Sequence, residues 1–172
     1  AEDAFAFLEK NNLLFTNDGK ENIVDDYCAL LAAVELFRTT GKPAYRVAAD
    51  LRAGSLIARL TSWAPEGSGA AGGVTSGGLR HENYWRADGA GGDRPFFHPV
   101  DAGMPAVGLL VYAEIADQAS RAKTLDAVKK SLGFELAVTG EVANPFGYSR
   151  QLVQSKGGAS TRRSAFFFPH DT

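Results

Sequence analysis

The sequence predicts an all-α fold in which αα-hairpins, pairs of consecutive antiparallel helices, are separated by long irregular loops. Apolar residues recur with helical rather than strand spacing in two blocks, over residues 25–62 and 101–143. Each block is divided by residues that stop and restart helices. A length of 172 residues suits one domain with a sizeable core, so residues 1–172 are predicted to belong to a single domain.

The first hairpin is expected to begin at Asp25 and Asp26, because acidic residues cap helices and favour the positive helix N-terminus. Its first helix carries an apolar stripe of Leu30, Leu31, Val34, Leu36 and Phe37. Gly41 is a typical helix stop and Pro43 a typical helix start. The second helix should extend to about Ser62, with apolar residues that include Tyr45, Val47, Leu51, Leu56 and Leu60.

The second hairpin is expected to begin near Asp101 and to break near Asp117. Its first helix carries Met104, Val107, Leu109, Tyr112 and Ile115. Its return helix starts at about Ser120 and carries Leu125, Val128, Leu132, Leu136 and Val138. Residues 4–8 suit half of a further hairpin.

The segment 63–100 between the hairpins is predicted to be a loop, because it holds nine of the 19 glycines and both tryptophans. Loops longer than about 12–15 residues are uncommon in compact domains unless they are functional or disordered. Residues 79–100 are dense in aromatic, charged and histidine side chains, which favours an ordered binding loop. Residues 144–172 are predicted to form an irregular tail.

Repeated αα-hairpins close into a toroid or stack into a solenoid. A loop of this length between repeats is typical of a toroid, whose loops at one rim build an active site. The sequence therefore favours part of a toroid, and a helical-repeat protein-interaction module without catalysis is the alternative.

Composition argues against several classes of partner. A net charge of -2 disfavours nucleic-acid and membrane-surface binding, and no apolar run is long enough to span a membrane. The lone Cys28 cannot form an internal disulfide, and the spacing of His81, His98 and His170 does not indicate a metal site. The Gly-rich run 67–72 lacks the preceding strand and following helix of a dinucleotide site. No cofactor or metal is therefore expected.

The candidate binding residues occur at the helix starts and in the loop. Asp26, Tyr27 and Asp101 stand at the starts of two first helices, where carboxylates either cap the helix or bind hydroxyl groups. Trp85 and His98 lie in the loop. A tryptophan in that setting either pins the loop or offers a stacking face to a sugar ring.

Several blocks along the chain also carry a family resemblance: Glu21–Leu30, Asn83-Tyr84-Trp85-Arg86, Asp93–Pro105, Asn144–Ser149 and Phe167–His170. In this order they resemble the C-terminal half of family 9 glycoside hydrolases, and most of all the branch of exo-acting glucosaminidases and cellulase-like bacterial enzymes. The resemblance covers nearly the whole chain and implies an (α/α)6 toroid of six hairpins. Other toroidal sugar enzymes, such as epimerases and polysaccharide lyases, lack the Asn144–Ser149 block.

The resemblance implies hydrolysis of a β-linked oligosaccharide or polysaccharide with inversion. Family members activate water with an N-terminal carboxylate pair and use an acidic glutamate placed shortly after the segment that here ends in His170. Both catalytic groups are thus expected outside these 172 residues, so none is assigned here and the fragment is expected to be inactive alone. The candidate sugar contacts are Asp26, Tyr27, Trp85, His98, Asp101 and His170.

The expected partner is a carbohydrate, and an open arc of hairpins should self-associate or pair with the missing half of the domain. A secreted or periplasmic location is favoured over a cytoplasmic one, although Cys28 by itself is compatible with either.

Overall fold

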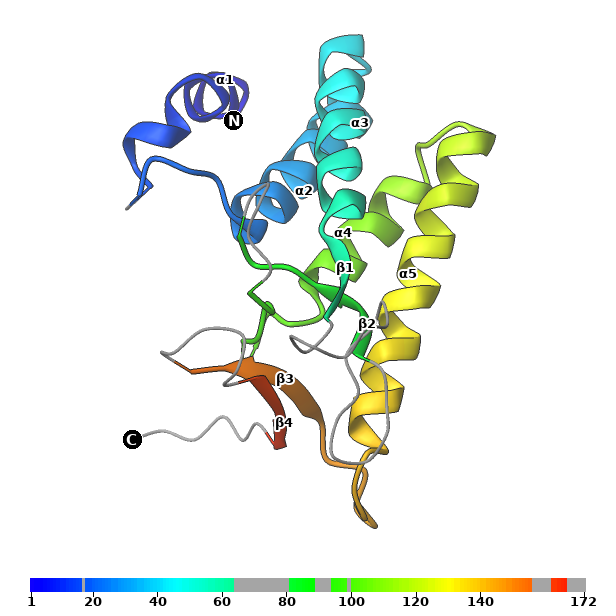
Figure 1. Cartoon of the computed structure of the whole chain (residues 1–172). Coiled ribbons are helices and arrows are strands. Elements are labelled where there is room, and N and C mark those ends of the chain that lie inside the picture. The colour runs from blue at the N-terminus through cyan, green and yellow to red at the C-terminus, as the bar shows by residue number, and fades with distance from the viewer. Residues whose placement is uncertain (17, 64–80, 89–93, 99, 156–161, 167–172) are drawn as a thin grey trace.

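The computed structural model describes residues 1–16, 18–63, 81–88, 94–98, 100–155 and 162–166, and over these the chain is mostly helical (Figure 1). The helices are α1 (Glu2–Asn11), η1 (Asn12–Leu14, a 3-10 turn), α2 (Ile23–Thr40), α3 (Pro43–Ala58), α4 (Met104–Ala113) and α5 (Gln118–Thr139). The strands are β1 (Leu60–Trp63), β2 (His81–Trp85), β3 (Arg150–Gln154) and β4 (Arg162–Phe166).

The four strands correct the prediction of an all-α fold. β1 and β2 form one antiparallel pair and β3 and β4 form another, where the sequence predicted the end of a helix, a loop and an irregular tail. Short strands are stabilised by pairing with a partner distant in sequence, and helical periodicity does not report such a partner. Asn83 is the extra residue of a bulge in β2 and has a φ of 62°, a conformation that asparagine tolerates.

The predicted ends of the first two helices are confirmed, except that the first of them begins earlier than predicted. Asn22 caps α2: its side chain accepts a hydrogen bond from the Val24 amide at 2.8 Å, and Asp25 accepts one from the Asn22 amide at 2.7 Å. This capping box starts α2 two residues before Asp25. Gly41, with a φ of 67°, ends the helix, and Pro43 stands in the first turn of α3.

The second predicted pair has its break at the expected residue. Asp117 is the N-cap of α5, and its carboxylate accepts a hydrogen bond from the Ser120 amide at 2.9 Å. α4 begins at Met104, three residues after Asp101, with Pro105 in its first turn.

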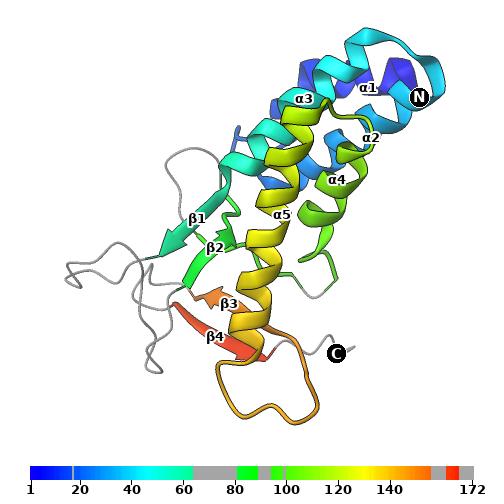
Figure 2. The same ribbon diagram turned by 90° about the vertical axis from the view of Figure 1, so that its right-hand side faces the viewer.

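The main core lies between α2, α3, α4 and α5, which pack on one another as Figure 2 shows. Its buried side chains include Ile23, Leu30, Val34, Leu56, Leu109 and Val128. A second, smaller cluster joins α5 to both sheets and consists of Tyr84, Phe134, Val138 and Leu152. The helices and the strand pairs are therefore parts of one packed unit.

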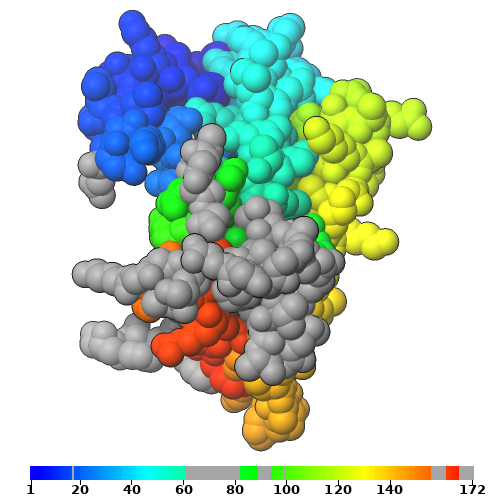
Figure 3. Space-filling model, viewed as in Figure 1, coloured from blue at the N-terminus to red at the C-terminus, as the bar shows by residue number. Residues whose placement is uncertain are grey.

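Several apolar residues predicted to form core stripes are exposed instead. They are Val47 and Leu51 on α3, Val107 on α4, and Leu125, Leu132 and Leu136 on α5. α1, which is described over its whole length, buries none of its residues. Phe7 and Leu8 on this helix are exposed, and so are Leu13, Leu14 and Phe15 in and just after η1. α1, α3 and the start of α5 follow one another across the upper part of one face (Figure 3). This degree of apolar exposure is typical of a surface that another element covers.

Candidate functional site

Three of the six predicted site residues meet where α2 and α4 begin. The phenol of Tyr27, in the first turns of α2, lies close enough to the carboxylate of Asp101, just before α4, to interact with its charge. The Nδ1 atom of His98 lies 3.4 Å from an Asp101 carboxylate oxygen. Tyr27, His98 and Asp101 are called the junction site below.

The backbone of His98 is held by a side chain of β3. The His98 amide donates to the side-chain oxygen of Gln151 at 3.0 Å, and the Gln151 side-chain amide donates to the His98 carbonyl at 3.1 Å. Phe96, two residues earlier, packs its ring against Tyr27 at a centroid distance of 6.5 Å. The backbone of His98 is thus anchored from two sides, while Nδ1 of its imidazole accepts from backbone amides of the following turn and Nε2 is left for a ligand.

The junction site combines a donor and an acceptor at the surface. Nδ1 of His98 accepts a hydrogen bond from the Asp101 amide at 3.1 Å, so the neutral ring that fits this contact carries its proton on Nε2. The side chains of His98 and Asp101 are 46% and 40% exposed. An imidazole N–H beside a carboxylate can bind a hydroxyl group, or two neighbouring hydroxyl groups, of a ligand.

Tyr27 is a buried neighbour of this pair. Burial, and then the negative charge of Asp101, raises the pKa of the Tyr27 phenol to about 12, so the phenol stays protonated and uncharged over the physiological range. Its ring is almost fully buried in the main core. Tyr27 therefore does not present its own ring to a ligand, which corrects its prediction as a direct contact.

Asp26 is also misassigned as a direct ligand contact. Its side chain is buried and accepts hydrogen bonds from Arg59 Nε at 2.7 Å, Ser55 Oγ at 2.7 Å and Arg52 Nη1 at 3.1 Å. With both carboxylate oxygens occupied by α3, Asp26 has no free face for a sugar. It is the centre of an ion-pair network inside the protein.

This network ties the loop after β2 to the helices. Arg59 donates to the carbonyl oxygens of Ala87 at 3.2 Å and Asp88 at 2.5 Å, and the Ile23 amide also donates to Ala87 O at 3.0 Å. The sequence held an unused signal for it: Arg52, Ser55 and Arg59 are spaced i, i+3 and i+7, which places them on one face of a helix.

Trp85 does not offer a stacking face. The residue is 4% exposed and belongs to the main core, while its backbone pairs with Leu60 of β1 and with Phe96. Successive residues of a strand point to opposite faces, so Tyr84 packs in the smaller cluster and Trp85 in the main core. Both faces of β2 are covered here, and the alternative interpretation of a tryptophan that pins its loop is the one observed. The sixth predicted residue, His170, lies outside the described residues.

Glu135 on α5 is a titratable group that the sequence analysis missed. It is half-buried and lies in the same stripe as the buried Ser131 and Val138, four residues before it and three after it. Burial alone raises the pKa of the Glu135 carboxyl to about 7. In the sequence, the only sign of this burial is that Glu135 falls within an apolar stripe of the helix. Charged residues at the edge of a solvated helix face often have the same position, so the sign is weak.

Replacing Glu135 by Gln should stabilise the protein at pH 8 by about 1–2 kcal/mol. This free energy is smaller than the difference between the folded and unfolded pKa would give, because the side chain is partly exposed and solvent screens its charge. The folded-state pKa is raised, so the stability associated with the protonated carboxyl is complete below pH 4.5 and is lost as the pH rises to about 7. Urea unfolding between pH 4 and 8 measures this difference. Asp126→Asn, at an exposed position of α5, is the control for removing a negative charge; an equal gain in E135Q at pH 4 and pH 8 contradicts the prediction.

Over the part of the chain that the structure describes, no helix combines the length and apolarity needed to cross a membrane, and no three potential metal ligands (His, Cys, Asp or Glu) gather at one place. No model of a known protein family matches the chain, and no curated protein matches it at a significant level.

Proposed function

We propose that the chain is the carbohydrate-binding part of a glycoside hydrolase similar to family 9, which hydrolyses a β-linked oligosaccharide or polysaccharide with inversion. The observation that carries the proposal is the junction site. It places a hydrogen-bond donor on His98 and an acceptor on Asp101 side by side and half-exposed, in one of the blocks on which the family resemblance depends.

In this proposal each described residue has a limited role. His98 Nε2–H donates to one sugar hydroxyl, and the Asp101 carboxylate accepts from another. Tyr27, Asp26 and Trp85 belong to the buried framework behind the site. The chemistry belongs to two carboxylates outside these 172 residues, one that activates water and one that protonates the leaving oxygen, at a separation of roughly 6.5–9.5 Å.

We further propose that the helices are an arc of an (α/α)6 toroid. The contact between Tyr27 of α2 and Asp101 before α4 brings the starts of these two helices to the same side, as inner helices of a toroid require. The exposed leucines of α3 and α5 are then the faces that neighbouring hairpins cover.

Binding of a β-linked glycan tests the proposal directly. Titration with cello-oligosaccharides and, separately, chito-oligosaccharides should shift the amide NMR signals of His98 and Asp101. His98→Ala should weaken binding at least about fivefold, in line with the loss of a hydrogen bond of about 1 kcal/mol or more. Lys130→Ala, at an exposed site on α5, is the matched control. The proposal fails if neither sugar series shifts these amides or if His98→Ala binds as tightly as the parent chain.

Hydrolysis is the second readout. The purified 172-residue chain should not cleave an aryl β-glycoside faster than a heat-treated sample, because both catalytic carboxylates are assigned outside it. Cleavage above that background would show that the carboxylates are within the chain and would contradict this assignment.

The exposed apolar side chains favour a second candidate, a helical-repeat interaction module that binds a partner protein. Leu51, Leu132 and Leu136 are all exposed, and such surfaces commonly seek a partner. Both candidate functions predict that the chain self-associates in sedimentation experiments. Glycan binding that depends on His98 is therefore the measurement that distinguishes them.

A further inference from the structure

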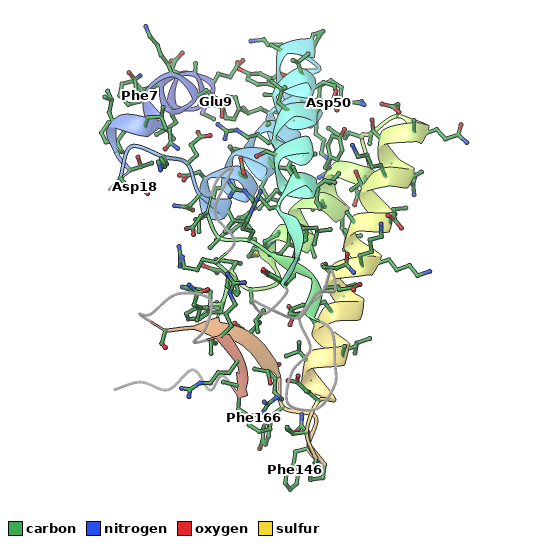
Figure 4. All side chains as sticks on the ribbon, viewed as in Figure 1. Phe7, Glu9, Asp18, Asp50, Phe146 and Phe166 are labelled. Carbon is green, nitrogen blue, oxygen red and sulfur yellow. The ribbon has the colours of Figure 1, made fainter. Side chains whose placement is uncertain are left out.

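A cavity lies between α1 and α2, away from the junction site. Its lining comes from one stripe on each helix, at the spacing i, i+3, i+4 and i+7. The first stripe is Phe5, Leu8 and Glu9 of α1 with Asn12 at its C-terminal end, and the second is Asp25, Cys28, Ala29 and Ala32 of α2. Arg52 of α3 completes the lining. Figure 4 shows Glu9 on the side of α1 that faces α3, whereas Phe7 lies on the other side.

The residue sizes explain why space is left here. Cys28, Ala29 and Ala32 are small, so α2 presents a shallow surface, and the side chains of Phe5 and Leu8 do not fill it. The cavity has a volume of about 150 Å³. A closed apolar cavity of about that volume holds one benzene-sized ring, whereas this cavity is partly open to solvent and has polar side chains along part of its lining.

The polar groups at the cavity are already bound to one another. Asp25 accepts hydrogen bonds from Asn12 at 3.1 Å and from the Asn22 amide at 2.7 Å. Arg52 donates to Glu9 at 2.8 Å and to Glu21 at 2.8 Å. A charged ligand would have to displace one of these interactions at a cost in desolvation, whereas an uncharged ring would need only the walls of Phe5, Leu8 and Ala29.

Cys28 places a chemical handle on the wall of the cavity. The residue as a whole is exposed, but its thiol is partly shielded from water. This shielding, and then the negative charges of Asp25 and Asp101, raise the pKa of the thiol. A thiol of this kind is mostly protonated near neutral pH and reacts slowly by itself. Selective capture of one reagent at Cys28 therefore reports the affinity of the neighbouring cavity for the group that the reagent carries.

We propose that the cavity between α1 and α2 is a binding site for a small uncharged molecule built on one aromatic or alicyclic ring, with Cys28 at its edge. The inference is independent of the glycoside proposal, because it uses neither His98 nor Asp101. It also assigns α1, which buries none of its own residues, a role as one wall of a ligand site.

Thiol–disulfide exchange with the intact chain tests the site. Two disulfides that each release 2-mercaptoethanol are compared: a mixed disulfide that carries a phenylethyl group, and the symmetrical disulfide that carries a second hydroxyethyl group. The Cys28 thiolate attacks the disulfide, a Cys28–S–S–R bond forms, the reagent's S–S bond breaks, and 2-mercaptoethanol leaves and takes up the proton that Cys28 lost. At equilibrium in excess 2-mercaptoethanol, mass spectrometry should show about tenfold stronger capture of phenylethyl, equivalent to about 1.4 kcal/mol.

Matched variants assign the preference to the cavity. Ala32→Phe fills the cavity from an exposed position and should reduce the capture ratio to about 1, whereas Thr39→Phe adds the same ring elsewhere on α2 and should leave the ratio unchanged. Equal capture of both groups by the parent chain, or an unchanged ratio in Ala32→Phe, overturns the proposal. In Cys28→Ser, benzene alone should still shift the Ala29 amide signal, and the absence of a shift overturns the site even if Ala32→Phe does not fold.

Discussion

Asp26→Ala is expected to destabilise the protein by about 3–5 kcal/mol, because it leaves buried positive charge without its partner. Asp26 is 1% exposed and accepts hydrogen bonds from Arg59, Arg52 and Ser55. Arg59 is itself buried and has no other carboxylate among its hydrogen-bond partners over the described residues. Urea unfolding at pH 7 and 25 °C measures the effect.

Asp25→Ala is the matched control for this change, because it removes the adjacent carboxylate of the same helix. Asp25 contributes to the capping box of α2, and its loss should cost about 1 kcal/mol. Adding Arg59→Met to Asp26→Ala should recover part of the lost stability, because the unpaired buried charge is then removed as well. If Asp26→Ala costs no more than Asp25→Ala, Asp26 is not the centre of a buried network.

Trp85→Ala is expected to cost about 3–5 kcal/mol of stability, because it removes a large aromatic ring from the main core and leaves a cavity. Trp85 belongs to the same core cluster as Tyr27 of α2 and Leu109 of α4, so the loss should also loosen the contact between these helices. Thermal or urea unfolding monitored by circular dichroism measures the change.

Phe146→Ala removes an aromatic ring from the surface and is the comparison for Trp85→Ala. Phe146 is 80% exposed at the turn after α5, where Figure 4 shows it at the end of the molecule. Its loss should change stability by no more than about 0.5 kcal/mol. A Trp85→Ala variant that is as stable as the parent chain but has lost glycan binding would restore the stacking role that the sequence predicted.

The helix boundaries could be predicted where the deciding interactions are local. Gly41 and Pro43 separate α2 from α3, and Asp117 caps α5, as their positions in the sequence indicate. A helix stop needs only one residue in a left-handed conformation, and a cap needs only a side chain within three residues of the amide that it binds. Such contacts can be recognised without knowing the rest of the fold.

The strands could not be predicted in this way. β1 pairs with β2 across a segment of undescribed residues, and β3 pairs with β4 across another. Each strand is four or five residues long, and its stability depends on partners and on packing against α5 that helical periodicity does not report. The composition of residues 63–100 indicated a loop because the segment holds many glycines, and the five residues of β2 are too few to change that composition.

The sequence by itself determined the helical character of the chain and the positions of most helix ends, because both depend on periodicity and on interactions within one turn. Only the tertiary structure decided which of the candidate side chains reach the surface. Asp25 and Asp26 are neighbours of the same type, yet one caps a helix and the other pairs with Arg52 of α3 and with Arg59 at the end of that helix. Trp85 is buried, whereas His98 and Asp101 are half-exposed, because burial is a property of which elements pack together and not of residue type alone.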